Sequence, residues 1–236
     1  MSESFGSAFA LLPGLISATV VFFALDLWRR AVAASHLSGG HGRSILVGAV
    51  LAAWLGLALL ATHTPVLGRA VASTPGVLPA LLLLTIIAAV LAGWPSACRR
   101  AFDRIPLESV MDFFYWRAVF GALIIAAYAA GRLPAGFAVS AGLGDIAVTM
   151  LMILVLALRP AAGEIPRGAF LLWNVIGLID LVIAVPVLGA LVLRPWAAER
   201  GLTGHFGLQL FAVPLFIAIH LHLFARLWRE RGSLAR

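Results

Sequence analysis

Long apolar stretches, separated by short polar segments, run through the whole chain. Seven of these stretches reach or approach the ~20 residues that a helix needs to cross a hydrocarbon core of about 30 Å. They cover residues 8–27, 44–62, 77–94, 115–131, 136–158, 169–193 and 206–227. The segments between them are too short to form a soluble domain. The pattern therefore predicts an all-α polytopic membrane protein with seven transmembrane helices and a single domain over residues 1–236.

The composition supports this class of protein. The chain is 62% hydrophobic and 11% charged, whereas about 25% of the residues of an ordinary soluble domain are charged. All 17 basic residues are arginine, and the net charge is +7. A positive charge of this size occurs in nucleic-acid-binding proteins and in membrane proteins, so the distribution of the arginines decides between the two.

The arginines alternate between the two sides of the predicted helices. Thirteen lie in one set of alternating segments: Arg29, Arg30, Arg43, Arg99, Arg100, Arg104, Arg117, Arg159, Arg167, Arg226, Arg229, Arg231 and Arg236. The opposite segments hold only Arg69, Arg132, Arg194 and Arg200. Because cytoplasmic loops are enriched in basic residues, we expect the N-terminus outside, the C-terminus in the cytoplasm, and a bacterial-type inner membrane. The lipid bilayer is then the expected partner, and nucleic acid is not.

Four ionisable side chains lie inside the last three apolar stretches: Asp145, Asp180, His220 and His222. A charged side chain near the bilayer centre costs roughly 2.5–3.5 kcal/mol on insertion scales, so such residues usually face a protein interior and mark a functional site. His220 and His222 are two positions apart on a helix and point to opposite faces, so both cannot bind one metal ion. No metal site is predicted.

The depths of the two aspartates follow from helix geometry. Each aspartate precedes an arginine, Arg159 or Arg194, by 14 residues, which is about 21 Å along a helix. Because the two helices run in opposite directions, we expect Asp145 in the outer half of the membrane and Asp180 in the inner half, about 10 Å apart along the bundle axis. This offset favours a line of groups from Asp145 through His220 to Asp180 over a compact pair.

Chains of Asp and His within membrane spans are what proton and ion pathways require. The favoured hypothesis is a proton-coupled transporter or channel for an ion or small molecule. Asp145 and Asp180 would carry protons, His220 would relay protons or bind the ligand, and Asn174 would orient them. Arg117 and His222 are secondary candidates, because Arg117 can either extend to the interface or reach into the bundle.

Membrane enzymes are the first alternative. Gly142-Leu143-Gly144-Asp145 resembles the GxGD motif of intramembrane aspartyl proteases. That resemblance implies that two aspartates on neighbouring helices share a proton and activate water. In this chain the second aspartate, Asp180, follows the motif, whereas in that family the first aspartate precedes it.

A haem-binding redox protein that uses His220 as an axial ligand is another alternative. A retinal Schiff base is excluded, because that linkage needs a lysine and the chain has none. A non-catalytic receptor or subunit, in which the polar residues only hold helices together, is the remaining alternative. Whether the protein is an enzyme and how it oligomerises are left open at this point.

Overall fold

A computed structural model describes residues 25–26, 29–30, 40–74, 76–92, 96–158, 165–200 and 205–234. All the regular elements in these ranges are helices. The first predicted stretch, residues 8–27, lies outside the described residues except for Leu25 and Asp26. Each of the other six predicted stretches coincides with a helix in the described residues.

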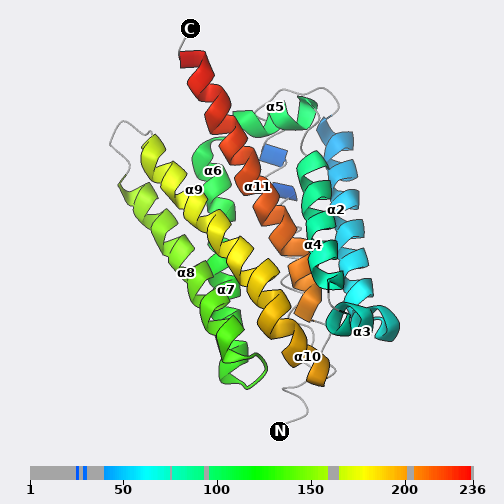
Figure 1. Ribbon diagram of the computed structural model, residues 1–236. Coiled ribbons are helices and arrows are strands. Elements are labelled where there is room, and N and C mark those ends of the chain that lie inside the picture. Colours follow the sequence, from blue (N-terminus) through cyan, green and yellow to red (C-terminus); the bar gives the residue numbers. More distant parts are fainter. Residues whose placement is uncertain are drawn as a thin grey trace.

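Six long helices stand side by side and run alternately up and down (Figure 1). They are α2 (Gly40–His63), α4 (Val77–Ala92), α7 (Tyr115–Ala129), α8 (Ala135–Ala157), α9 (Arg167–Val182) and α11 (His205–Leu234). Shorter elements connect or extend them: α3 (Pro65–Ser73), α5 (Ser96–Arg104), α6 (Leu107–Phe113), two π-helical segments η1 (Ile183–Val187) and η2 (Gly189–Leu193), and α10 (Arg194–Arg200).

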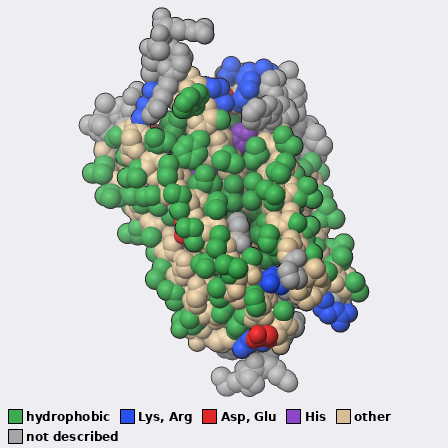
Figure 2. Space-filling view, viewed as in Figure 1, with side chains coloured by type: hydrophobic (Ala, Val, Ile, Leu, Met, Phe, Trp, Pro, Cys, Tyr) green, Lys and Arg blue, Asp and Glu red, His purple; other side chains and the backbone are tan. Residues whose placement is uncertain are grey.

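Four helical segments of the described chain are long and apolar enough to cross a membrane. They are Leu107–Ala129, Ala135–Ala157, Arg167–Arg200 and Gln209–Arg229. Two shorter apolar helices, Ala49–Ala61 and Val77–Leu91, accompany them. Hydrophobic side chains accordingly cover most of the visible surface, and arginines lie mainly toward its two ends (Figure 2). The described part of the chain is therefore a membrane-embedded helical bundle.

The segment that contains α7 begins earlier than the apolar pattern predicts. α6 starts at Leu107, directly after Pro106, and continues through Phe114 into α7. A proline at this boundary is favourable, because N–H groups at the start of a helix have no acceptor within the helix. The N–H group that proline lacks therefore costs no hydrogen bond. Arg117 is therefore ten residues inside the segment, about 15 Å from its start, and not at its end.

Helices α7 and α8 pack closely because glycines face each other where they cross. A Cβ atom at Gly142 would lie 2.8 Å from the side chain of Ile125 and 3.0 Å from the carbonyl oxygen of Gly121. Small residues allow membrane helices to approach to backbone contact. Gly131, with φ of 70°, closes the turn between the two helices. Arg117 lies on α7 and Asp145 lies on α8, so the close packing of these two helices brings the two residues together.

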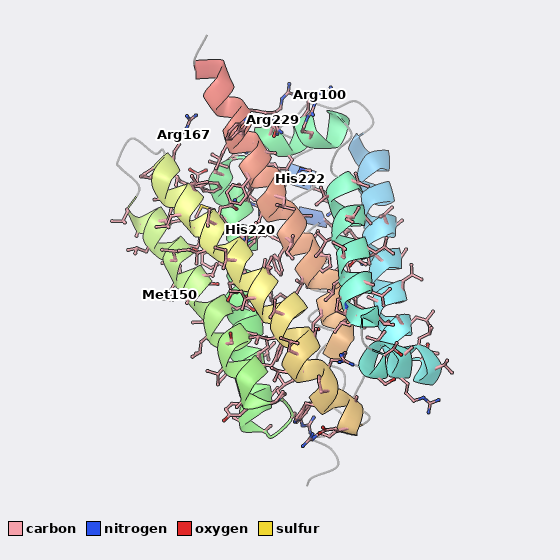
Figure 3. The ribbon with its side chains drawn as sticks, in the orientation of Figure 1. Arg100, Met150, Arg167, His220, His222 and Arg229 are labelled. Atoms are coloured by element: carbon pink, nitrogen blue, oxygen red, sulfur yellow. The ribbon has the colours of Figure 1, made fainter. Side chains whose placement is uncertain are left out.

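Helix α11 passes through the middle of the bundle and packs against α2, α4 and α9 (Figure 1). In its spanning window 67% of the residues are buried, against 39% or less in the other three spans. The end of the bundle at which α11 finishes is crossed by α5, and Arg100, Arg167 and Arg229 lie there (Figure 3). Arg229 pairs with Asp103 of α5 at 2.5 Å. This end is called the arginine-rich end below.

Candidate functional site

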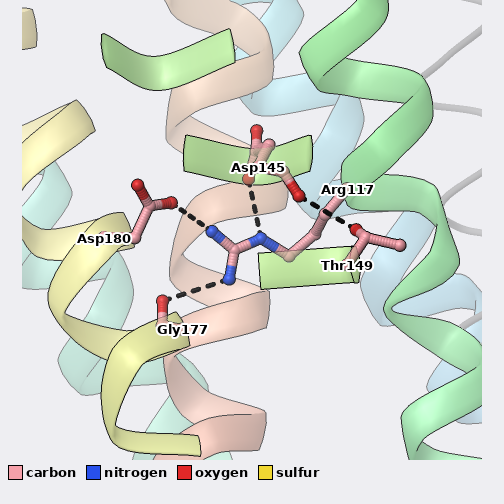
Figure 4. A network of polar contacts seen from close by, with 5 residues as sticks. All are labelled: Arg117, Asp145, Thr149, Gly177 and Asp180. Carbon is pink, nitrogen blue, oxygen red and sulfur yellow. Dashed lines mark hydrogen bonds and ion pairs between the residues drawn. The ribbon is translucent and has the colours of Figure 1, made fainter. Parts of the chain in front are cut away.

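The guanidinium group of Arg117 joins three helices (Figure 4). Its Nε atom donates a hydrogen bond to Oδ1 of Asp145 on α8 at 2.7 Å, and its Nη2 atom donates to Oδ2 of Asp180 on α9. Its Nη1 atom donates to the backbone carbonyl of Gly177, also on α9, at 3.1 Å. The arginine is fully buried. We call Arg117, Asp145 and Asp180 the charge cluster.

The predicted 10 Å offset between the aspartates is wrong, because both carboxylates bind the same guanidinium. Asp145 lies twelve residues before the end of α8 at Ala157, and Asp180 lies thirteen residues after the start of α9 at Arg167. Both are therefore about 18–20 Å from the same end of the bundle. The error came from measuring Asp180 from Arg194, which does not end a span, since the helical segment continues to Arg200.

The predicted order Asp145, His220, Asp180 is also wrong. Arg117 lies between the aspartates, and His220 lies beside Gly177 and Arg117. Arg117 was only a secondary candidate because it was placed at the beginning of a span. Pro106 was the signal that the span starts earlier, and an arginine ten residues inside a span needs a buried anion.

Asn174 and His220 form a second polar pair, between α9 and α11. The Asn174 amide nitrogen donates to the backbone carbonyl of His220 at 3.2 Å, and Oδ1 of Asn174 is 2.7 Å from Nδ1 of His220. Because a carbonyl can only accept, the Asn174 amide has one orientation, and Nδ1 of His220 must carry the hydrogen that Oδ1 accepts. In the neutral ring Nε2 then carries the lone pair. Asn174 thus fixes the orientation of the His220 ring.

The imidazole of His220 is enclosed by aromatic rings. The ring centroids of Phe114 and Trp173 are 4.5 and 5.4 Å away. Its Nε2 atom is buried and has no hydrogen-bond partner among the residues that the structure describes. This atom faces the backbone of Gly177, where an added Cβ atom would be 3.0 Å away. A haem bound through Nε2 does not fit, because the macrocycle would need the space that α9 occupies.

His222 is separate from this pair. Its side chain is half-buried, and its ring packs against Phe102 of α5, with centroids 6.0 Å apart. Figure 3 shows His222 nearer than His220 to the arginine-rich end. Among the described residues, no group of three or more His, Cys, Asp or Glu side chains could hold a metal ion.

The protease resemblance is only partly matched by the geometry. Asp145 and Asp180 lie on neighbouring helices, but each directs a carboxylate oxygen at Arg117. Two aspartates that activate water share a proton with each other, and here a guanidinium takes that position. Both glycines of the motif serve packing: Gly142 contacts α7, and Gly144 lies so close to the Asp180 carboxylate that a Cβ atom would collide with it.

The aspartates are more exposed than the arginine that binds them. The side chains of Asp145 and Asp180 are 15% and 18% exposed, and that of Arg117 is 1% exposed. Figure 2 shows acidic atoms at mid-height on a face that is otherwise mostly hydrophobic. With both carboxylates ionised, the charge cluster has one excess negative charge, because two anions share one cation.

The Asn174–His220 pair should behave as a coupled unit. Replacing Asn174 with leucine leaves the Nδ1–H group of His220 buried without a partner, and we expect a loss of about 1–3 kcal/mol in the free energy of unfolding. His220→Phe alone should cost a similar amount, because it leaves the Asn174 amide oxygen unpaired. The double variant should lose much less than the sum of the two. Unfolding in bicelles measures this, and strictly additive losses would contradict the pairing.

Comparison with known protein families assigns most of the chain to a family. A family model described as a domain of unknown function, DUF8737, matches residues 74–228, which include the charge cluster, Asn174 and His220. No curated protein matches the chain. No solved structure matches it either. Since the model covers more than half of the sequence, the chain belongs to the DUF8737 family of unknown function.

Proposed function

We propose that this protein is a proton-coupled transporter or channel for an ion or small molecule, in which the charge cluster binds the proton. The observation that carries the proposal is the binding of two carboxylates by one guanidinium in the middle of a membrane-embedded bundle. An excess charge in a low-dielectric interior is costly. One proton on either carboxylate makes the cluster neutral, so the cluster is suited to take up and release a single proton.

His220 is the second proton-binding group of this proposal. Its Nε2 atom carries a lone pair that nothing in the described chain uses. A Cβ atom at Gly177 would lie 3.0 Å from Nε2 and 3.1 Å from Nη1 of Arg117. The imidazole and the charge cluster therefore approach each other across a glycine. A proton that leaves the cluster has a buried acceptor next to it, as a relay requires.

The proposal includes the membrane topology and location. We place seven spans in one domain, with the N-terminus outside and the C-terminus in the cytoplasm of a bacterial-type inner membrane. Support comes from the arginine-rich end, where α11 finishes and where Arg100, Arg167 and Arg229 lie (Figure 3). Cytoplasmic ends of spans are enriched in arginine.

Infrared titration tests whether the cluster takes up a proton. In lipid nanodiscs, acidification should produce the C=O band of a protonated carboxylic acid. Asp145→Asn and Asp180→Asn should each reduce this band, because each variant leaves a single carboxylate that the guanidinium neutralises. Asp103→Asn is the matched control, since its carboxylate pairs with Arg229 at the partly exposed arginine-rich end.

Proton flux tests the transport role separately. Proteoliposomes loaded with a pH-sensitive dye should acidify under an imposed potential, and both cluster variants should reduce this flux to the level of protein-free liposomes. Flux equal to the wild type in both variants would overturn the transport role of the cluster, and a lowered melting temperature in those variants would leave it a role in holding helices together.

A further inference from the structure

The charge cluster has an outward side between α8 and α9. Asp145 and Asp180 each give one carboxylate oxygen to Arg117 and leave the second oxygen outside that pair. Both side chains are partly exposed, at 15% and 18%. Partly exposed carboxylates in a membrane-spanning bundle need a hydrogen-bond donor or a cation.

The inner side of the cluster adds a further acceptor. Nε2 of His220, which is fully buried, has no partner among the described residues and faces the Gly177 backbone next to Nη1 of Arg117. The site therefore has acceptor atoms in excess and one excess negative charge when both aspartates are ionised. A ligand that matches this chemistry carries one positive charge.

The surface around the carboxylates is apolar and made of large side chains. Ile176 and Ile183, about one helical turn to either side of Asp180, are 39% and 47% exposed. Membrane helices pack against one another through small residues, and the small residues here, Gly142 and Gly144, are already covered by Ile125 and Asp180. This surface does not favour a second helix. It favours a small ligand with an apolar body.

We propose that the charge cluster is also the substrate site, and that it binds a lipophilic monovalent cation that enters from the bilayer between α8 and α9. This inference rests on the proposed proton-coupled function and names its substrate class. A neutral, protonated cluster that binds the cation releases one proton, and the occupied cluster is again neutral. The charge of the occupied site is the same in both cases, so the cation and the proton compete for one site.

Binding of tetraphenylphosphonium to the purified protein in zwitterionic lipid nanodiscs tests the inference. Tetraphenylborate, which has the same shape and the opposite charge, is the matched ligand control. The cation should bind above the level of empty nanodiscs and the anion should not. Binding should weaken as the pH falls through the range in which the infrared carboxyl band grows, because the proton and the cation compete for one negative charge.

Asp145→Asn and Asp180→Asn should each weaken cation binding at least about tenfold, the equivalent of about 1.4 kcal/mol. Asp103→Asn should leave it unchanged, since it removes the same charge from another part of the surface. Melting curves show that each variant is folded. The comparison of the two ions and the pH dependence need only the wild-type protein, so they test the inference even if a variant unfolds.

The outcomes of the binding and infrared experiments distinguish the cation site from the proposed proton-coupled function. Equal binding of both ions, or cation binding that does not depend on pH, would overturn the cation site while the carboxyl band could still establish the proton site. Absence of the carboxyl band would instead overturn the proton-coupled function. A wild-type dimer that Asp180→Asn converts to a monomer would assign the α8–α9 face to a second copy of the chain and would also overturn the inference.

Discussion

Replacing Arg117 with methionine is expected to lower the free energy of unfolding by about 3–5 kcal/mol, the cost of removing one partner from a buried ion pair. The guanidinium bonds Asp145, Asp180 and the Gly177 carbonyl. Without it, two carboxylates lose their cationic partner in a low-dielectric interior. Because the three partners belong to α8 and α9, the loss should also loosen the contact of these helices with α7.

Neutralising the whole cluster tests whether unpaired charge causes this loss in the free energy of unfolding. The triple variant Arg117→Met, Asp145→Asn, Asp180→Asn removes all three charges and should recover much of the lost stability, since replacing every member of a buried ion pair is often close to neutral. Reversible unfolding in bicelles measures both variants. Wild-type stability in the single variant would show that the ion pairs do not stabilise the fold. No recovery in the triple variant would show that Arg117 acts by packing alone.

Gly177→Ala is the second change for which we expect a large effect. The added Cβ atom would lie 2.7 Å from Cε1 of His220 and 3.1 Å from Nη1 of Arg117. Both neighbours are buried and held by hydrogen bonds, so neither can withdraw without breaking one. Overpacking of this kind costs about 1–3 kcal/mol. We expect a loss near the upper end of this range and a weaker proton flux.

The same helix provides the control for this variant. Gly168, in the first turn of α9, has no atom within 4 Å of an added Cβ. Gly168→Ala should therefore be neutral or stabilising by up to about 1 kcal/mol, the difference in helix propensity. Equal behaviour of the two variants in unfolding and flux measurements would mean that Gly177 does not separate Arg117 from His220 as the structure indicates.

The helices could be predicted because they depend on local pattern. Six predicted apolar stretches are helical in the described chain, since a segment in hydrocarbon must satisfy its own backbone hydrogen bonds. The residues at which the helices begin and end were less predictable. Pro106 precedes a helix that starts at Leu107, eight residues before the start that the apolar pattern gives. The helical segment that contains Asp180 continues past Arg194 to Arg200.

The residues of the site could be named from the sequence, but their arrangement could not. The cost of burying charge was enough to select Asp145, Asp180 and His220 as candidates. The relative height of two helices, however, depends on where each one begins, and an error of a turn or more in either end changes which side chains meet. Arg117 was underrated for this reason, because its depth depended on the true start of its span.

By itself the sequence determined that this is an apolar helical protein with a few costly charges inside it, because hydrophobic length and charge burial are properties of single segments. The tertiary structure decided how those charges are compensated. Arg117 can neutralise Asp145 and Asp180 only because the glycine contact between α7 and α8, and the matched depths of α8 and α9, bring three helices to one guanidinium. Coulomb interactions depend on distance in space, and folding alone sets that distance.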